Sequence, residues 1–178
     1  MITYQPKIMD LTKTRTFTAK NRTNLVTVDN LLVPGEYRPE PFDSQEFTIL
    51  CEKMKEARRN HRPVVCFFGA HVIKCGLSKY LLWFLRNGYI THLAGNGACS
   101  IHDFELSYLG GTSEHVPTAI EDGTFGMWEE TGRWMNEAII AGASQNYGYG
   151  ESLAHYIDEH PNQFPYRDQC VFYQAYLN

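Results

Sequence analysis

The stretch FFGAHVIKCGLSKYLLWFLRNGYITHLAGNGACSIHDFE, residues 67–105, decides the fold. It contains the end of one apolar run, PVVCFFG at 63–69, and the whole of a second, YITHLA at 89–94. A glycine-bearing turn follows each run, and the residues after each turn have apolar side chains at helical spacing. Strands that alternate with helices indicate βαβ units, so the stretch predicts an α/β fold with a parallel sheet.

The flanking sequence predicts further helices around these two strands. Asp43 and Glu46 have capping-box spacing, which predicts a helix from Asp43 to about Asn60. Ser100 and Asp103 have the same spacing and predict that a later helix begins at Ser100. The run at 63–69 has the composition of a strand that is buried on both faces. Further helices are predicted at 77–86, 127–143 and 151–160, with a turn-rich connection at 111–126 and a short apolar segment at 170–177.

The chain divides into a polar arm, residues 1–40, and an α/β domain, residues 41–178. Within the arm only 25–28 and 31–33 have strand-like composition, and we expect the arm to pack on another part of the protein or on a neighbouring subunit. Two secure strands are too few for a stable doubly wound sheet. The pattern therefore indicates further strands in the arm or a sheet completed elsewhere.

Composition excludes several classes of protein. The net charge of −4 argues against a nucleic-acid-binding protein, because such a protein needs a concentrated basic surface. The chain has 5 cysteines and no CxxC motif, which argues against a disulfide framework or a four-cysteine zinc site. The start MITYQPKIMD lacks the apolar region of a signal peptide, and no apolar run is long enough to cross a membrane. We therefore expect a cytoplasmic protein without a metal site.

Both glycine turns follow predicted strands at the carboxyl end, where ligands bind in open α/β sheets. Glycine lets a backbone approach a ligand closely, and the first N–H groups of the next helix favour a phosphate. The alternative is a tight strand-to-helix turn that needs glycine only for its geometry. The predicted cofactor-binding residues are Gly69, Ala70, His71 and Lys74 in the first turn, and Gly95, Asn96, Gly97 and Ala98 in the second.

Two titratable residues next to the second turn are candidates for catalysis. His102 faces either the ligand or solvent, and Asp103 is either a functional carboxylate or a helix-capping residue. Cys75 and Cys99 lie near predicted helix starts, where the pKa of a thiol falls, but no histidine base can be assigned to either of them.

Five segments resemble the deoxyhypusine synthase family and its bacterial deoxyhypusine synthase-like relatives. They are KMKEARRNHRP at 53–63, VVCFFGA at 64–70, HVIKCGLSKYLLWFLRNG at 71–88, YITHLAGNGACSIHDFE at 89–105 and EDGTFGMWEETGRWMNEAI at 121–139. The resemblance implies a Rossmann-like NAD-binding fold, usually as a homotetramer with active sites between subunits. It also implies an NAD-dependent transfer of the aminobutyl group of spermidine, through an imine on a lysine, to another amine or to a protein lysine.

The resemblance places both glycine turns against NAD, with His102 in the position of an acidic residue that faces the cofactor and Asp103 beside it. The catalytic lysine of the family lies in a downstream glycine-rich segment, whereas the last lysine of this chain is Lys79. The chain is therefore expected to supply the amino-terminal portion of the fold, completed by another chain or fragment.

Two other functions are compatible with the sequence. One is a non-catalytic nucleotide-binding or assembly protein of the same fold. The other is a sirtuin-like NAD-dependent deacylase, since GAHVIKCGL at 69–77 loosely resembles the glycine turn of that family. The zinc cysteines of sirtuins and the second glycine of their turn are absent from this sequence, which counts against that alternative.

Overall fold

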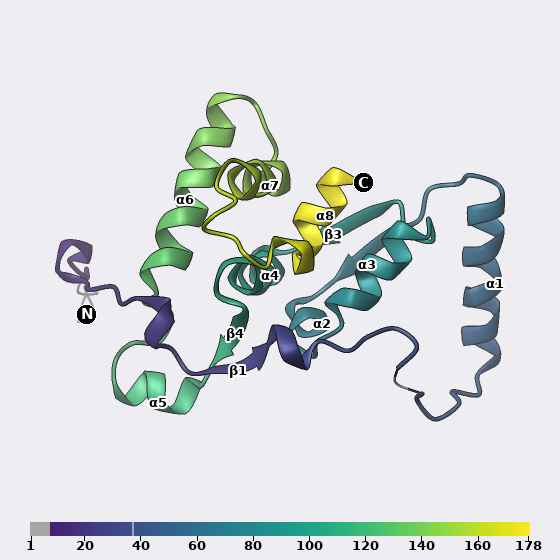
Figure 1. Cartoon of the computed structure of the whole chain (residues 1–178), viewed down its shortest axis with the longest axis horizontal. Helices are drawn as coiled ribbons and strands as arrows, with labels where there is room; N and C mark the ends of the chain where they lie inside the picture. The colour runs from purple at the N-terminus through teal and green to yellow at the C-terminus, as the bar shows by residue number, and fades with distance from the viewer. Residues whose placement is uncertain (1–7, 37) are drawn as a thin grey trace, which may run out of the picture.

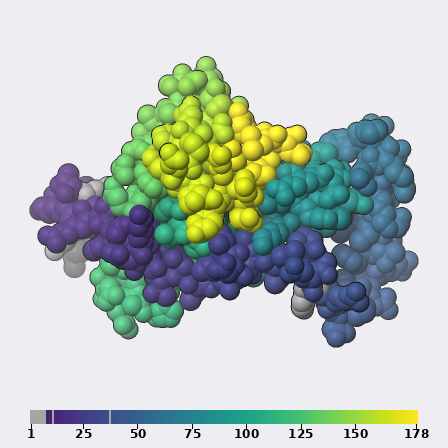
Figure 2. Space-filling view, viewed as in Figure 1, coloured from purple at the N-terminus to yellow at the C-terminus, as the bar shows by residue number. Residues whose placement is uncertain are grey.

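A computed structural model describes residues 8–36 and 38–178. Residues 1–7 and 37 of the predicted arm lie outside the described residues. The described chain is a mixed α/β structure, elongated in outline, with α1 at one end and the N-terminal segment at the other (Figures 1 and 2). Its α-helices are α1 (Gln45–Arg59), α2 (Ala70–Lys74), α3 (Ser78–Arg86), α4 (Gly97–Leu109), α5 (Val116–Glu121), α6 (Glu129–Ser144), α7 (Tyr149–Glu159) and α8 (Val171–Leu177). Short 3₁₀ turns span Leu11–Lys13, Ala19–Asn21, Val28–Asn30 and Arg167–Gln169.

The two predicted strands form a parallel pair. β2 (Val65–Phe68) lies beside β3 (His92–Gly95) with Val65 opposite His92 and Phe68 opposite Gly95. The crossover between them consists of α2 and α3, and α3 is followed by Gly88 at φ 67°, as predicted from its glycine. The prediction of a parallel βαβ unit is therefore confirmed.

The prediction that β2 is buried on both faces is wrong. Phe67 is 81% exposed and Val65 is 48% exposed, while Cys66 and Phe68 are half-buried. Strand residues alternate between the two faces of a sheet, so one face of β2 packs on the protein and the other is open. In the described chain this parallel sheet contains β2 and β3 only.

A second, antiparallel pair joins the N-terminal segment to the body of the protein. β1 (Asn24–Thr27) pairs with β4 (Gly111–Glu114), with Asn24 opposite Glu114 and Thr27 opposite Gly111. The strand-like composition of 25–28 marks β1, whereas 31–33 forms no strand. The prediction missed β4 and α5, which occupy the segment read as a turn-rich connection.

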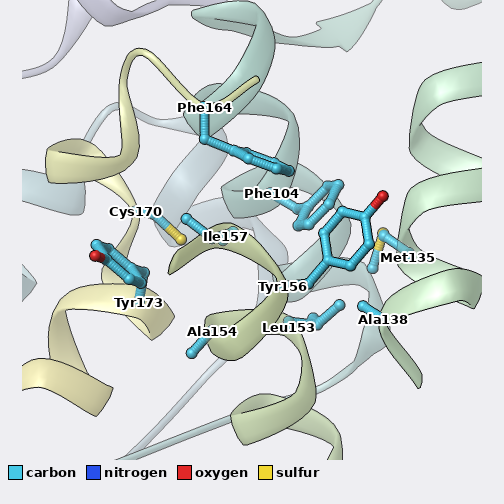
Figure 3. Packing of buried hydrophobic residues seen from close by; sticks show 10 residues of the cluster. All are labelled: Phe104, Met135, Ala138, Leu153, Ala154, Tyr156, Ile157, Phe164, Cys170 and Tyr173. Atoms are coloured by element: carbon cyan, nitrogen blue, oxygen red, sulfur yellow. The ribbon is translucent and has the colours of Figure 1, made fainter. Parts of the chain in front are cut away.

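Helix α4 occupies the middle of the molecule, between β4 on one side and α8 on the other (Figure 1). Its Phe104 packs in the main apolar cluster with residues of α6, α7 and the C-terminal segment (Figure 3). The rings of Phe104 and Phe164 pack edge to face, with 5.1 Å between their centroids. The segment at 170–177 belongs to this core because α8 buries Val171 and Tyr173.

Two predicted helix starts are wrong because another residue caps the helix. α1 begins at Gln45, since the side chain of Ser44, not that of Asp43, accepts a hydrogen bond from the N–H of Phe47 at 3.2 Å. α4 begins at Gly97, three residues before Ser100, because Asn96 accepts from the N–H of Cys99 at 3.1 Å. No helix in the described part of the chain is long and apolar enough to cross a membrane.

The packing of α6 on α7 depends on Gly142. A Cβ added there would lie 2.5 Å from the Cβ of Ser152 on α7, whereas a Cβ at Gly132 of the same helix would meet nothing within 4 Å. We expect Gly142→Ala to lower the free energy of unfolding by about 1–3 kcal/mol, because overpacking forces the helices apart. The control Gly132→Ala should raise it by about 0.5–1 kcal/mol through helix propensity. Urea denaturation of both variants measures the difference, and equal stabilities would contradict this account of the contact.

Candidate functional site

The two predicted glycine turns lie side by side at the carboxyl edge of the parallel sheet. β2 ends at Phe68, and Gly69 is the N-cap residue of α2. β3 ends at Gly95, and Asn96 is the N-cap residue of α4. Phe68 pairs with Gly95 in the sheet register, so the turns are neighbours. Gly69 and residues 95–98 are exposed, and Ala70 is half-buried as the first residue of α2.

The glycines of these turns are present for different reasons. A Cβ on Gly95 would lie 2.8 Å from the Phe172 ring of α8, so packing explains this glycine. A Cβ on Gly69 or Gly97 would meet nothing within 4 Å, and neither residue has the positive φ that favours glycine. The surroundings in the described chain therefore do not require glycine at 69 or 97, and the backbone there is open to close approach by another molecule.

The start of α4 carries the hydrogen-bond donors of the edge. The N–H groups of Gly97 and Ala98 lie in the first helical turn, where the helix itself offers no acceptor, and they form the positive end of the helix dipole. Buried Cys99 donates from its Sγ to the carbonyl of Phe68 at 3.1 Å, which links the two turns. Cys99 therefore has a structural role, while Cys75 is exposed.

The structure brings three of the predicted residues together. α2 packs on α4 beside the strand ends, and the charges of Lys74 and His71 on α2 act on His102 of α4. His71 is exposed, and Lys74 and His102 are half-buried. Burial lowers the pKa of His102 below its ordinary value, Glu105 opposes this effect, and Lys74, Arg22 and a protonated His71 add to it. These surroundings therefore favour the neutral form of His102.

A buried ion pair lies behind His102. The Arg22 guanidinium binds Glu105 through two hydrogen bonds, Nη1 to Oε1 at 2.6 Å and Nη2 to Oε2 at 2.8 Å, and both side chains are 3% exposed. Thr112 donates to Oε2 of Glu105 at 2.6 Å, and Thr131 donates to Oε1 at 3.0 Å. Four donors thus satisfy the carboxylate, which acts only as an acceptor. Oγ1 of Thr112 also lies 2.7 Å from Nδ1 of His102, so the network reaches the candidate site.

Asp103 does not face the glycine turns, and it does not cap the helix that contains it. Its carboxylate is fully buried and accepts hydrogen bonds from the N–H of Val171 at 2.8 Å, the N–H of Phe172 at 2.9 Å and Sγ of Cys170 at 3.0 Å. Val171 and Phe172 form the first turn of α8, so Asp103 supplies the acceptor that the end of this helix needs. Its capping role is therefore real, but it acts on a different helix.

The candidate site is an open edge, and two surface hollows of the described chain lie elsewhere. One hollow of about 580 Å³ lies among 33–34, α3 and 168–169, and one of about 400 Å³ lies between Arg22 and α5. Neither is lined by the ten predicted site residues. In the ranges 8–36 and 38–178, no group of three or more histidine, cysteine, aspartate or glutamate side chains is placed to hold a metal ion.

Sequence reasoning missed the residues behind His102. Arg22 and Glu105 are 83 positions apart, and Thr112 lies in a strand that was not predicted. Glu105 lies between the buried residues Phe104 and Leu106 of α4. A charged residue at such a position is the one sequence feature that could have indicated a buried ion pair. Searches of protein-family models, curated proteins and solved structures find no match to this chain.

Proposed function

We propose that the carboxyl edge of β2 and β3 binds NAD and that the chain supplies this wall to a deoxyhypusine synthase-like active site. One observation supports this most strongly. Two adjacent parallel strands each lead, through a glycine whose surroundings leave space for a ligand, into a helix. Dinucleotides bind in open α/β sheets in this way, with the pyrophosphate at a helix N-terminus.

The proposal assigns a task to each part of the edge. The N–H groups of Gly97 and Ala98 meet the pyrophosphate, and Lys74 adds a positive charge nearby. Gly69 and Ala70 form the adjacent part of the wall. NAD, when bound, supplies hydride chemistry, which suits the oxidation of a spermidine-like amine. The lysine that would carry the aminobutyl group has no counterpart here after Lys79 and is assigned to a completing chain.

The same proposal includes a Rossmann-like fold, that is, a larger parallel sheet flanked by helices. In this proposal β2 and β3 are the first two strands of that sheet. The exposed apolar side chains of Val65 and Phe67 support a partner on that face, because a strand buried on one side only leaves apolar area in water. The proposed partner is a second copy of the chain, in a homo-oligomer such as a tetramer, or a complementing fragment.

Calorimetric titration with NAD tests the proposal. Gly69→Leu places a side chain in the space left for the ligand, and we expect it to weaken NAD binding by about tenfold or more, equivalent to at least 1.4 kcal/mol. Gly148→Leu is the matched control. Gly148 is also a helix N-cap with an extended backbone and no atom within 4 Å of an added Cβ, but it lies at the start of α7 and belongs to neither glycine turn.

Two results would contradict the proposal. One is no NAD binding by the unmodified protein together with any fragment that copurifies with it, identified by intact mass. The other is equal weakening by Gly69→Leu and Gly148→Leu. Spermidine turnover in the same sample separates a transferase from a non-catalytic NAD-binding protein of the same fold, because the second binds NAD without consuming the amine.

A further inference from the structure

The hydroxyl of Thr112 has one hydrogen. The direction in which this hydrogen points determines which ring nitrogen of His102 carries the proton. Each oxygen of Glu105 already accepts a hydrogen bond from Arg22, so the carboxylate is ionised and acts only as an acceptor. Oγ1 of Thr112 lies 2.6 Å from Oε2 of Glu105 and therefore uses its hydrogen there. Toward His102, 2.7 Å away, the same oxygen has only a lone pair to offer.

We infer that Arg22, Glu105 and Thr112 form a relay that holds His102 as its Nδ1–H tautomer, leaving Nε2 as a hydrogen-bond acceptor for a donor group of the ligand bound at the strand edge. This inference rests on the proposed function for the ligand, but the tautomer itself follows from the relay alone. His102 is the residue that would touch the ligand, and Thr112 is a positioning residue that acts through it.

The surroundings of His102 keep Nε2 unprotonated. The cations that act on the ring are Arg22 behind the relay and Lys74 on α2, joined by His71 when it is protonated, and each of them disfavours the imidazolium. Glu105 acts on His102 in the opposite direction, at 4.0 Å from Nδ1 to Oε2, but Arg22 already pairs with this carboxylate. Burial acts in the same direction as the positive charges, since His102 is 19% exposed.

A neutral ring in this position differs in its chemistry from a carboxylate. Nε2 offers one directional lone pair without a net charge, so it can accept from a ribose hydroxyl or from an amine N–H. The neighbouring Lys74 can meet a phosphate without forming an ion pair with the acceptor. The site would thus accept a hydroxyl or amine beside a phosphate.

Nitrogen NMR of histidine-labelled protein at neutral pH tests the tautomer without any ligand. We expect the His102 signals of a protonated Nδ1 and an unprotonated Nε2. In Thr112→Val the hydroxyl is lost, and the Nε2–H form that imidazole side chains favour in water should appear. Thr112→Ser keeps the hydroxyl and should restore the original spectrum, a change that a merely structural role of Thr112 would not produce.

An Nε2–H or fully protonated His102 in the unmodified protein, or identical spectra for Thr112→Val and Thr112→Ser, would overturn the relay. The ligand contact is tested separately by NAD titration of two variants. His102→Asn keeps an N–H for Thr112 but has no acceptor at the Nε2 position, and we expect it to bind NAD about tenfold more weakly. His102→Gln places an amide near the Nε2 position and should recover part of the affinity.

The two tests distinguish a failure of the proposed function from a failure of the role assigned to His102. If NAD does not bind to the unmodified protein but the tautomer is as expected, the proposed function fails and the relay stands. If NAD binds equally well to the unmodified protein and to His102→Asn, the function stands and the assignment of His102 as the acceptor is wrong.

Discussion

Replacing Arg22 with methionine should lower the free energy of unfolding by about 3–5 kcal/mol, the range expected when one partner of a buried ion pair is removed. Both charges are 3% exposed, so Glu105 would be left ionised with water excluded. The variant would also lose the hydrogen bond from Nε of Arg22 to Asn24 at 2.8 Å and the contact of its guanidinium with the Trp128 ring at 5.5 Å. Chemical denaturation near neutral pH measures the loss.

Arg133 provides the matched control because it has the same side chain and two carboxylate partners at the surface. It binds Glu129 at 2.9 Å and Glu137 at 3.3 Å, and its side chain is 50% exposed. Arg133→Met should therefore cost far less stability than Arg22→Met, because solvent screens the pair. Equal losses for the two variants would show that Glu105 is not a desolvated charge.

A double variant separates the two contributions to this loss. Adding Glu105→Gln to Arg22→Met removes the uncompensated charge but keeps the shape and the acceptor for one threonine hydroxyl. We expect the double variant to be more stable than Arg22→Met alone, because the penalty of an unpaired buried carboxylate exceeds the loss of its remaining hydrogen bonds. A double variant less stable than the single one would contradict this.

Local patterns predicted the parts of the fold that depend on neighbouring residues. The parallel β2–β3 pair and the end of α3 before Gly88 follow from apolar runs and glycine positions in the sequence. The starts of α1 and α4 were predicted two and three residues away from their places, because several capping residues compete there and only the folded backbone selects one.

Contacts between distant segments could not be predicted from those patterns. Asp103 has capping spacing with Ser100, yet the N–H groups it binds lie 68 and 69 positions further along the chain. Similarly, the relay behind His102 needs an arginine that precedes Glu105 by 83 positions. For β2, composition indicated burial on two faces, but one of those faces is exposed, since composition reports what a strand can pack against and not what covers it.

The second large effect concerns Asp103. Removing its carboxyl group in Asp103→Ala would leave the N–H groups of Val171 and Phe172 without their acceptor in the protein interior. Each of the two unsatisfied donors costs about 1–3 kcal/mol, so we expect a loss of about 2–6 kcal/mol at pH 4–5. Asp103→Asn should lose stability too, because one carboxylate oxygen would become an NH₂ group that faces another donor. The loosened α8 should become more susceptible to proteolysis.

The loss of stability in Asp103→Ala should become smaller as the pH rises, because Asp103 is buried. Burial raises the pKa of its carboxyl to about 6, against the hydrogen bonds from Cys170, Phe172 and Val171 that lower it. A folded-state pKa above the unfolded value of about 3.9 means that the contribution to stability is fully present below about pH 4. The contribution is lost as the pH rises through about 6, so the gap between the original protein and Asp103→Ala should narrow over this range.

Asp168 supplies the control for both the loss and its pH dependence, because it is an exposed aspartate two residues before Cys170. Asp168→Ala should change stability by no more than about 0.5 kcal/mol, as expected for an exposed side chain. Denaturation of the three proteins from pH 4 to 8 makes the comparison. A gap between the original protein and Asp103→Ala that widens with rising pH would show that hydrogen bonding outweighs burial at Asp103, and its carboxylate would then stabilise the docking of α8 most strongly when ionised.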